Sequence, residues 1–348
     1  MNKTSAGEYE LALSRKDSQR RKNVARGLNL PQDQQAPELD LCSFARSLKQ
    51  SFRNHELLNS IMIREDAAVQ KLQLTPDYSR IIYLTSRFVK IRELGDMLVA
   101  KTDLVENGVR YTSIAASPDG VRVAIACTVT DGSTEVHIYN MDEAIFEHPI
   151  RGFEGGSTIT DLTYSRDGEM IACGCSDGKV LLLRSQVSEV GEEHILGALE
   201  GHVGNVTSVV FLCNQQLATG GKDKTVHIWD LDQMTLARRL TGHQDGVTGV
   251  AYSGSGNQLL SSGSDGCTKL WNFESGQQLH NFTEAKSHNC VAVTSDNSLA
   301  LVGTDNSRIV IWNVQTKERV VALIEHGRGL RHICIASDNR YFVSAGND

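Results

Sequence analysis

The sequence has 348 residues, of which 40% are hydrophobic and 22% are charged, and its formal net charge is −7. No apolar run approaches the ~20 residues of a membrane-spanning helix, and the amino-terminal segment lacks the apolar stretch of a secretory signal. The eight cysteines show no paired framework and lie mostly in apolar runs, which is typical of free thiols in a reducing compartment. These features predict a cytoplasmic or nuclear protein without a membrane span.

Charge separates the first residues from the rest of the chain. Residues 1–54 contain ten Lys/Arg and six Asp/Glu, a net charge of +4, so the remainder carries −11 of the total. The stretch SRKDSQRRKNVARG (14–27) fits a nuclear-import signal or a nucleic-acid contact, and equally a solvated tail or a partner-docking helix. Nucleic acid is therefore predicted as a partner only through this tail. Residues 1–55 are predicted to be a basic extension, flexible or helical.

Residues 41–62 follow, with apolar side chains at helical spacing, which predicts an amphipathic helix. The end of this stretch, ELLNSIMI (56–63), also suits the outer strand of a sheet. We place the boundary of the second domain here and predict that residues 56–348 form one repeating unit after another.

Repetition dominates the second domain. Aspartates end successive short apolar runs at intervals of 46, 46, 42, 40 and 43 residues: Asp131, Asp177, Asp223, Asp265, Asp305 and Asp348. Around each aspartate lie short β-branched runs bounded by Gly, Asp, Asn and Ser, which predict antiparallel strands joined by hairpins. A weaker copy at 72–94 brings the number of units to seven. Four strands in each unit of about 40–45 residues indicate the blades of an all-β propeller.

Aligned tryptophans carry a family resemblance. The third run of three units holds Trp229-Asp230, Trp271-Asn272 and Trp312-Asn313, and two units open with Gly201-His202 and Gly242-His243. With the repeat period, this pattern resembles the WD-repeat β-propeller family over about four-fifths of the chain. With the seven units counted above, we predict a seven-bladed WD-repeat propeller with a partly helical or disordered amino-terminal extension.

Two sets of residues look catalytic when taken alone. In WD-repeat proteins the corresponding residues form a structural hydrogen-bond network, which the resemblance places at His202, Thr219, Asp223 and Trp229, and again at His243, Ser261, Asp265 and Trp271. Because the set recurs at the repeat period, it favours a scaffold over a nucleophilic site. We therefore expect no enzyme activity, no cofactor and no small-molecule substrate.

Some units depart from this pattern. The third unit has Cys173 where Thr219 stands and Leu183 where Trp229 stands, and the sixth has Leu301 at the polar position. Cys173 and Cys175 would face the same side of a strand, but the sequence places no further Cys/His pair to complete four zinc ligands. No metal site is predicted.

The last unit raises the question of ring closure. The sequence stops at YFVSAGND (341–348), where a third strand would begin, so the final blade is predicted to be incomplete. Residues 57–63 could supply its outer strand and 330–347 its inner two. An incomplete blade would expose unpaired edge groups, and the chain is expected to be a fragment of a longer protein.

The predicted function is a non-catalytic scaffold or adaptor that binds other proteins or peptides through its propeller faces. In the family such contacts flank the hairpin Asp, which gives Asn205, Ser208, Lys222, Ser264 and Thr304 as binding residues. One alternative is the substrate receptor of a ubiquitin ligase, although Asp232 stands where such receptors tend to carry Arg. Another is a component of an RNA-processing assembly that uses the basic tail.

Overall fold

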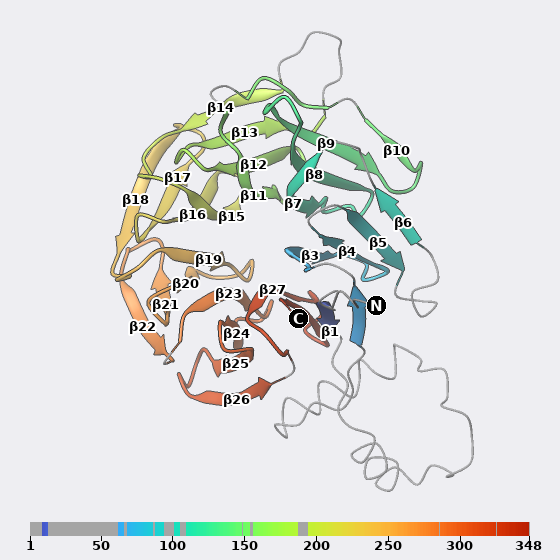
Figure 1. Cartoon of the computed structure of the whole chain (residues 1–348). Helices are drawn as coiled ribbons and strands as arrows, with labels where there is room; N and C mark the ends of the chain where they lie inside the picture. Colours follow the sequence, from blue (N-terminus) through green and yellow to red (C-terminus); the bar gives the residue numbers. More distant parts are fainter. Residues whose placement is uncertain are drawn as a thin grey trace, which may run out of the picture.

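The computed structural model describes residues 9–12, 62–65, 68–85, 88–93, 101–104, 109–147, 149–153, 156–186, 194–284, 286–324 and 326–347. These residues form β-strands joined by turns, and no α-helix occurs among them (Figure 1). In this part of the chain there is accordingly no helix of the length and apolar character that crossing a membrane would need.

Six blades each consist of four consecutive antiparallel strands around a central channel (Figure 1). Blades 1 to 3 contain β3 (Lys71–Leu74), β4 (Arg80–Leu84), β5 (Val89–Glu93) and β6 (Lys101–Leu104); β7 (Arg110–Ala116), β8 (Arg122–Thr128), β9 (Thr134–Asn140) and β10 (Ile145–Phe146); and β11 (Ile159–Tyr164), β12 (Met170–Cys175), β13 (Val180–Arg184) and β14 (Ile195–Leu199). Blades 4 to 6 contain β15 (Val206–Cys213), β16 (Gln216–Gly221), β17 (Thr225–Asp230) and β18 (Thr235–Thr241); β19 (Val247–Ala251), β20 (Gln258–Gly263), β21 (Cys267–Asn272) and β22 (Gln278–Thr283); and β23 (His288–Val293), β24 (Leu299–Thr304), β25 (Arg308–Asn313) and β26 (Arg319–Ile324).

A further sheet, the composite sheet, combines strands from both ends of the chain. Its inner strands are β27 (Leu330–Ile335) and β28 (Phe342–Gly346), followed by β1 (Tyr9–Ala12) and then β2 (Met62–Glu65). In the register, Leu11 of β1 pairs with Ala345 of β28 and with Ile63 of β2. The open edge of β28 is thus covered by a strand from the amino-terminal part.

The fold class expected from the sequence is wrong in three respects. The described chain builds six blades from consecutive strands where seven were expected, and the last repeat joins the composite sheet. That sheet is not incomplete, because β1 takes the place of the missing third strand. Among the described residues the amino-terminal part contributes strands and no helix. The amphipathic segment 41–62 lies almost wholly outside the described residues, and the boundary at 55/56 stays a prediction.

A hydroxyl at a bulge ties the innermost strands of successive blades to one another. In β15, the register shifts between Val206 and Ser208, and the Oγ1 of the bulged Thr207 lies 2.9 Å from Gly220 O in its own blade and 2.7 Å from Val247 O in the next. The bulged Thr248 of β19 bonds in the same way to His288 O, at 2.6 Å. A bulge is a fixed feature of a sheet, so these hydroxyls set the spacing between blades.

An ion pair crosses the central channel. Lys71 of β3 pairs with Asp161 of β11, two blades away, and the two side chains are only 12% and 14% exposed. Lys71 Nζ also donates to Ser113 Oγ at 2.9 Å, and Asp161 Oδ2 accepts the backbone N–H of Val209 at 2.8 Å. Four blades are thereby connected at one level of the channel. Burial, together with the charge of Lys71, lowers the pKa of the nearby His332 to about 4, so this imidazole is neutral at pH 7.

Candidate functional site

The residues that look catalytic in blade 4 form a continuous hydrogen-bond chain. His202 Nδ1 lies 2.9 Å from Asp223 Oδ2, and His202 Nε2 lies 2.8 Å from Thr219 Oγ1. Trp229 Nε1 donates to the same Thr219 oxygen at 2.8 Å. His202, Thr219 and Trp229 are buried. The structure therefore brings all four predicted residues together.

One set of proton positions satisfies every member of this chain. The ionised Asp223 accepts the Nδ1–H of a neutral His202, whose Nε2 lone pair accepts the Thr219 O–H, and the Thr219 oxygen then accepts the Trp229 N–H. Burial lowers the pKa of His202, which favours this neutral form. Both ring nitrogens are used, so the imidazole has no free position from which to activate a nucleophile. The cluster holds together β16, β17, the hairpin between them and the loop that precedes β15.

Blade 5 repeats this network. His243 Nδ1 lies 3.0 Å from Asp265 Oδ2, His243 Nε2 lies 2.7 Å from Ser261 Oγ, and Trp271 Nε1 donates to Ser261 at 2.8 Å. Here too the four predicted residues meet.

A third histidine of this kind was missed in the sequence. His326 Nε2 lies 2.8 Å from Ser344 Oγ in β28, and both residues are buried. The signal was its spacing, because His326 precedes Ser344 by 18 residues, as His243 precedes Ser261. His326 escaped attention because it follows Glu325, where the other two histidines follow glycine.

His227 extends the network of blade 4 on its outer side. Its ring stacks on that of His202 with centroids 3.7 Å apart and an angle of 9° between the planes. Arg239 Nε donates to His227 Nε2 at 3.1 Å, and His227 Nδ1 is buried without a hydrogen-bond partner among the described residues. Stacking places an apolar ring face over His202, so His227 shields the network from solvent.

The atoms of His202, Asp223 and His227 lie within 4.8 Å of one another and are a conceivable metal-ligand set. Their geometry suits a metal ion poorly. Both nitrogens of His202 are already bonded, and the lone pairs of two parallel stacked rings run side by side and do not converge on one point. The Arg239 guanidinium beside His227 also disfavours a cation.

Acid is expected to destabilise the fold through His227. Burial, followed by the neighbouring His202, lowers the pKa of His227 to about 3 from an ordinary value of 6.5. Between pH 6.5 and 3 the unfolded chain therefore binds a proton that the folded chain excludes, so stability falls as the pH falls. Urea denaturation at pH 7, 6 and 5 should give a shallower decline for His227→Gln than for the natural chain, by up to ~1.4 kcal/mol per pH unit. Equal slopes would contradict this role.

Two of the predicted binding residues, from separate loops of blade 4, are joined by a backbone hydrogen bond. The side of the ring that carries the Gly-His loops and the hairpin aspartates is called the loop face here. Lys222 is exposed on this face, and its backbone N–H donates to Asn205 O at 2.9 Å. Ser264 holds the equivalent place in blade 5, where its N–H donates to Gly246 O at 2.9 Å. These three residues mark the junction of blades 4 and 5.

The other two predicted residues are used inside the fold. Ser208 Oγ accepts the backbone N–H of Val250 at 3.2 Å, which joins two inner strands. Thr304 is 2% exposed, and its hydroxyl bonds to Asn306 Oδ1 at 2.6 Å and to Arg308 O at 2.9 Å. Their hydroxyls are thus occupied within the propeller.

One exposed apolar residue of the loop face was missed in the sequence. Val203, which follows the network histidine, is 79% exposed. Its backbone N–H donates to Asp223 Oδ2 at 3.0 Å, so the network itself fixes this loop. In blade 5 the Gln244 N–H bonds to Asp265 Oδ2 in the same way, at 2.8 Å. The exposure of Val203 could not be predicted from the sequence, because it depends on the direction in which the folded loop points the side chain.

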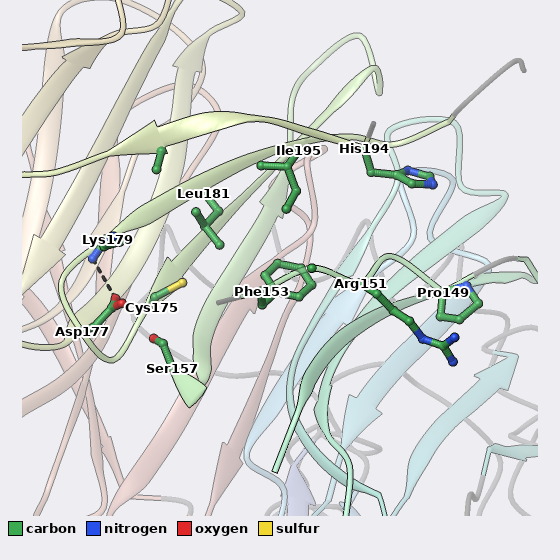
Figure 2. A pocket seen from close by; sticks show the side chains of 12 residues that line it. Pro149, Arg151, Phe153, Ser157, Cys175, Asp177, Lys179, Leu181, His194 and Ile195 are labelled. Carbon is green, nitrogen blue, oxygen red and sulfur yellow. Dashed lines mark hydrogen bonds between the residues drawn. The ribbon is translucent and has the colours of Figure 1, made fainter. Parts of the chain in front are cut away.

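Blade 3 has apolar side chains at the positions that the hydrogen-bond network occupies in blade 4. Cys173 and Leu183 are buried at the positions of Thr219 and Trp229, as the sequence predicted from their register. Burial raises the pKa of Cys175 to about 12, so its thiol is protonated and unreactive at pH 7. Between blades 2 and 3 lies a cavity of about 700 Å³ (Figure 2).

Comparison with known proteins identifies the family. Residues 60–316 match the family described as nucleolar protein 10-like, N-terminal domain, a β-propeller family. The chain belongs to this family. The match covers β2 and the six blades except β26, and the resemblance to WD-repeat propellers that the tryptophans and Gly-His pairs indicated is confirmed.

Similar proteins come from several functional settings. The chain is 30% identical over 190 residues to apoptotic protease-activating factor 1 of Rattus norvegicus, covering 49% of this chain and 15% of that protein. It is 30% identical over 175 residues to pre-mRNA-processing factor 19 of Bos taurus, covering 49% of this chain and 34% of that protein. It thus spans well under two thirds of the length of these relatives.

A solved structure shows the same fold. One chain of a crystal structure of the mitotic checkpoint complex superposes with a TM-score of 0.70 and 19% sequence identity, covering 80% of this chain and 84% of that chain. At this identity the likeness concerns the propeller fold alone.

Proposed function

We propose that the chain is a non-catalytic scaffold that holds partner proteins on the loop face of blades 4 and 5. The observation that carries this proposal is the exposure of Val203 on a loop that the His202 network fixes. A rigid loop keeps this apolar side chain exposed to water. A partner that covers it removes apolar surface from water, which favours binding.

The surroundings of Val203 suit a protein interface. Lys222 supplies an exposed cation, and beside it lies the half-buried Asn205, whose Oδ1 is buried without a hydrogen-bond partner among the described residues. A Cβ on Gly246 would lie 3.0 Å from Lys222 Cδ, so the absence of a side chain there lets the lysine stem cross to blade 5. Small apolar centres with a polar rim are typical of protein interfaces.

Replacing Lys222 with Glu and Asn205 with Ala together is expected to weaken partner capture at least tenfold while the melting temperature stays within about 2 °C. Affinity purification with quantitative mass spectrometry measures the capture. Arg238→Glu, a charge reversal on the exposed outer strand of the same blade, is the matched control and should leave capture unchanged. If both variants retain all partners, these residues do not belong to the site.

We infer further that the complex is nuclear and concerned with RNA processing, since relatives include a pre-mRNA-processing factor and the family is named after a nucleolar protein. Fractionation of cells that express the full-length protein should then place it with nuclear ribonucleoprotein particles, and ribonuclease treatment should alter its sedimentation. Sedimentation with cytoplasmic complexes alone would remove this setting and leave the scaffold role intact. The role of residues 14–27 in nucleic-acid binding stays a prediction, because they lie outside the described residues.

A further inference from the structure

The cavity between blades 2 and 3 is an open groove with apolar walls. Figure 2 shows Leu181 and Ile195 of blade 3 on one side and Phe153 and Arg151, which follow blade 2, on the other. Phe153, Leu181 and Ile195 are only partly buried against the core cluster between these blades. At about 700 Å³, the groove has the size of sites that hold small molecules or the side chains of a peptide.

The groove exists because blade 3 lacks the side chains that fill this place in blade 4. Strand pairing makes Leu181 and Ala198 the counterparts of His227 and Arg239. In blade 4 the arginine covers the histidine, whereas in blade 3 a methyl group stands in its place. The sequence also has Gly155, four residues before Ile159, where blade 4 has His202, four residues before Val206.

Blade 5 shows the same filled arrangement. Its counterpart pair is Lys269 and Asn281, two polar side chains whose Nζ and Oδ1 lie 3.5 Å apart. The groove of blade 3 therefore distinguishes it from blades 4 and 5, where polar side chains occupy the counterpart positions.

The mouth of the groove carries an oriented cation. Glu135 Oε1 accepts the Nε–H of Arg151 at 2.7 Å, and the arginine side chain is 70% exposed. Its two terminal nitrogens have no partner among the described residues, so they are free to bind a carboxylate with two parallel hydrogen bonds. On the opposite wall, next to Ile195, His194 Nδ1 is buried without a hydrogen-bond partner in the described part of the chain.

Arg151 is the group of the groove that an acidic occupant can reach. Lys179 also lines the groove, but its Nζ lies 2.9 Å from Glu200 Oε1, and Asp177 accepts the Lys179 backbone N–H at 3.0 Å. A carboxylate in the groove is therefore expected to bind the terminal nitrogens of Arg151.

We propose that this groove binds a short extended peptide of a partner protein, which inserts an aromatic or large aliphatic side chain against Leu181 and Phe153 and places a carboxylate on Arg151. The inserted side chain takes the volume that His202, His227 and Arg239 fill in blade 4. The contact is separate from the loop face of blades 4 and 5, so it gives the scaffold a second partner-binding surface.

The test is selection of a phage-displayed library of random decapeptides on the purified chain. Selected sequences should pair a Phe, Leu, Ile, Met or Trp with an Asp or Glu within about three positions. Synthetic versions should lose at least tenfold in affinity, by fluorescence anisotropy, for Arg151→Glu and for Ala198→Arg, which rebuilds the filled arrangement of blade 4. A peptide whose acidic residue is changed to Lys should regain affinity for Arg151→Glu alone.

Two controls separate the groove from other surfaces. Ala237→Arg adds the same side chain to the exposed outer strand of blade 4, and Lys222→Glu alters the loop face; neither should change the binding of the selected peptides. The proposal is overturned if no peptide is selected, if selected peptides bind Ala198→Arg and Arg151→Glu as tightly as the natural chain, or if only Lys222→Glu weakens them.

Discussion

Asp161→Ala is expected to lower the free energy of unfolding by about 3–5 kcal/mol, the cost of leaving one partner of a buried ion pair without the other. Lys71 would keep its charge inside the channel with only Ser113 Oγ and the Leu162 carbonyl as hydrogen-bond partners. The Val209 N–H would lose its acceptor. Urea denaturation with an unchanged m-value would measure this loss.

An exposed ion pair supplies the comparison. Arg319 Nη1 lies 3.2 Å from Glu284 Oε1, and the arginine side chain is 52% exposed, so Glu284→Ala should cost less than about 1 kcal/mol. Lys71→Met combined with Asp161→Leu should recover part of the loss, because no isolated charge then remains buried. A cost for Asp161→Ala no larger than that of Glu284→Ala would show that the pair does not hold the blades together.

Thr219→Val should destabilise the protein by about 2–4 kcal/mol with almost no change in side-chain volume. The valine leaves two buried groups unpaired, His202 Nε2 and Trp229 Nε1, and each costs about 1–3 kcal/mol. Thermal unfolding followed by the near-ultraviolet signal of tryptophan would report both the loss of stability and the loosened indole.

Thr235→Val on the exposed strand β18 is the matched control and should change the stability by less than about 0.5 kcal/mol. Ser261→Ala in blade 5 should resemble Thr219→Val, since Ser261 bonds to His243 and Trp271 in the same way. If Thr219→Val behaves like the surface control, water has replaced the hydroxyl and the network contributes little.

Local repetition made much of this molecule predictable. Asp223, Thr219 and Trp229 recur at a fixed spacing, and a strand register that alternates every two residues carries that spacing directly into three dimensions. The same logic found Cys173 and Leu183 in blade 3. Where a unit departs in one residue, as at His326, the pattern search failed although the spacing to Ser344 was preserved.

Contacts between distant parts of the chain were beyond sequence reasoning. Nothing about the segment YELA marks Tyr9–Ala12 as the strand that pairs with β28, since four residues carry too little pattern to specify a partner nearly a chain length away. The pairing of Lys71 with Asp161 depends on the width of the channel, and the groove depends on Ala198 being smaller than its counterpart Arg239. These features depend on how the blades pack against one another, and the sequence of a single repeat does not determine that packing.

The composite sheet also has a consequence for the order in which the parts of the propeller fold. Strand β1 precedes all six blades in the chain, whereas its partner β28 follows them and is therefore synthesised later. Each blade can pack on its predecessor during synthesis, while the edge of β1 that does not pair with β2 lacks its partner until β28 is made. We therefore expect the ring to close late in folding, and a chaperone that covers the free edge of β1 in the meantime would favour closure within one chain over pairing with a neighbouring chain.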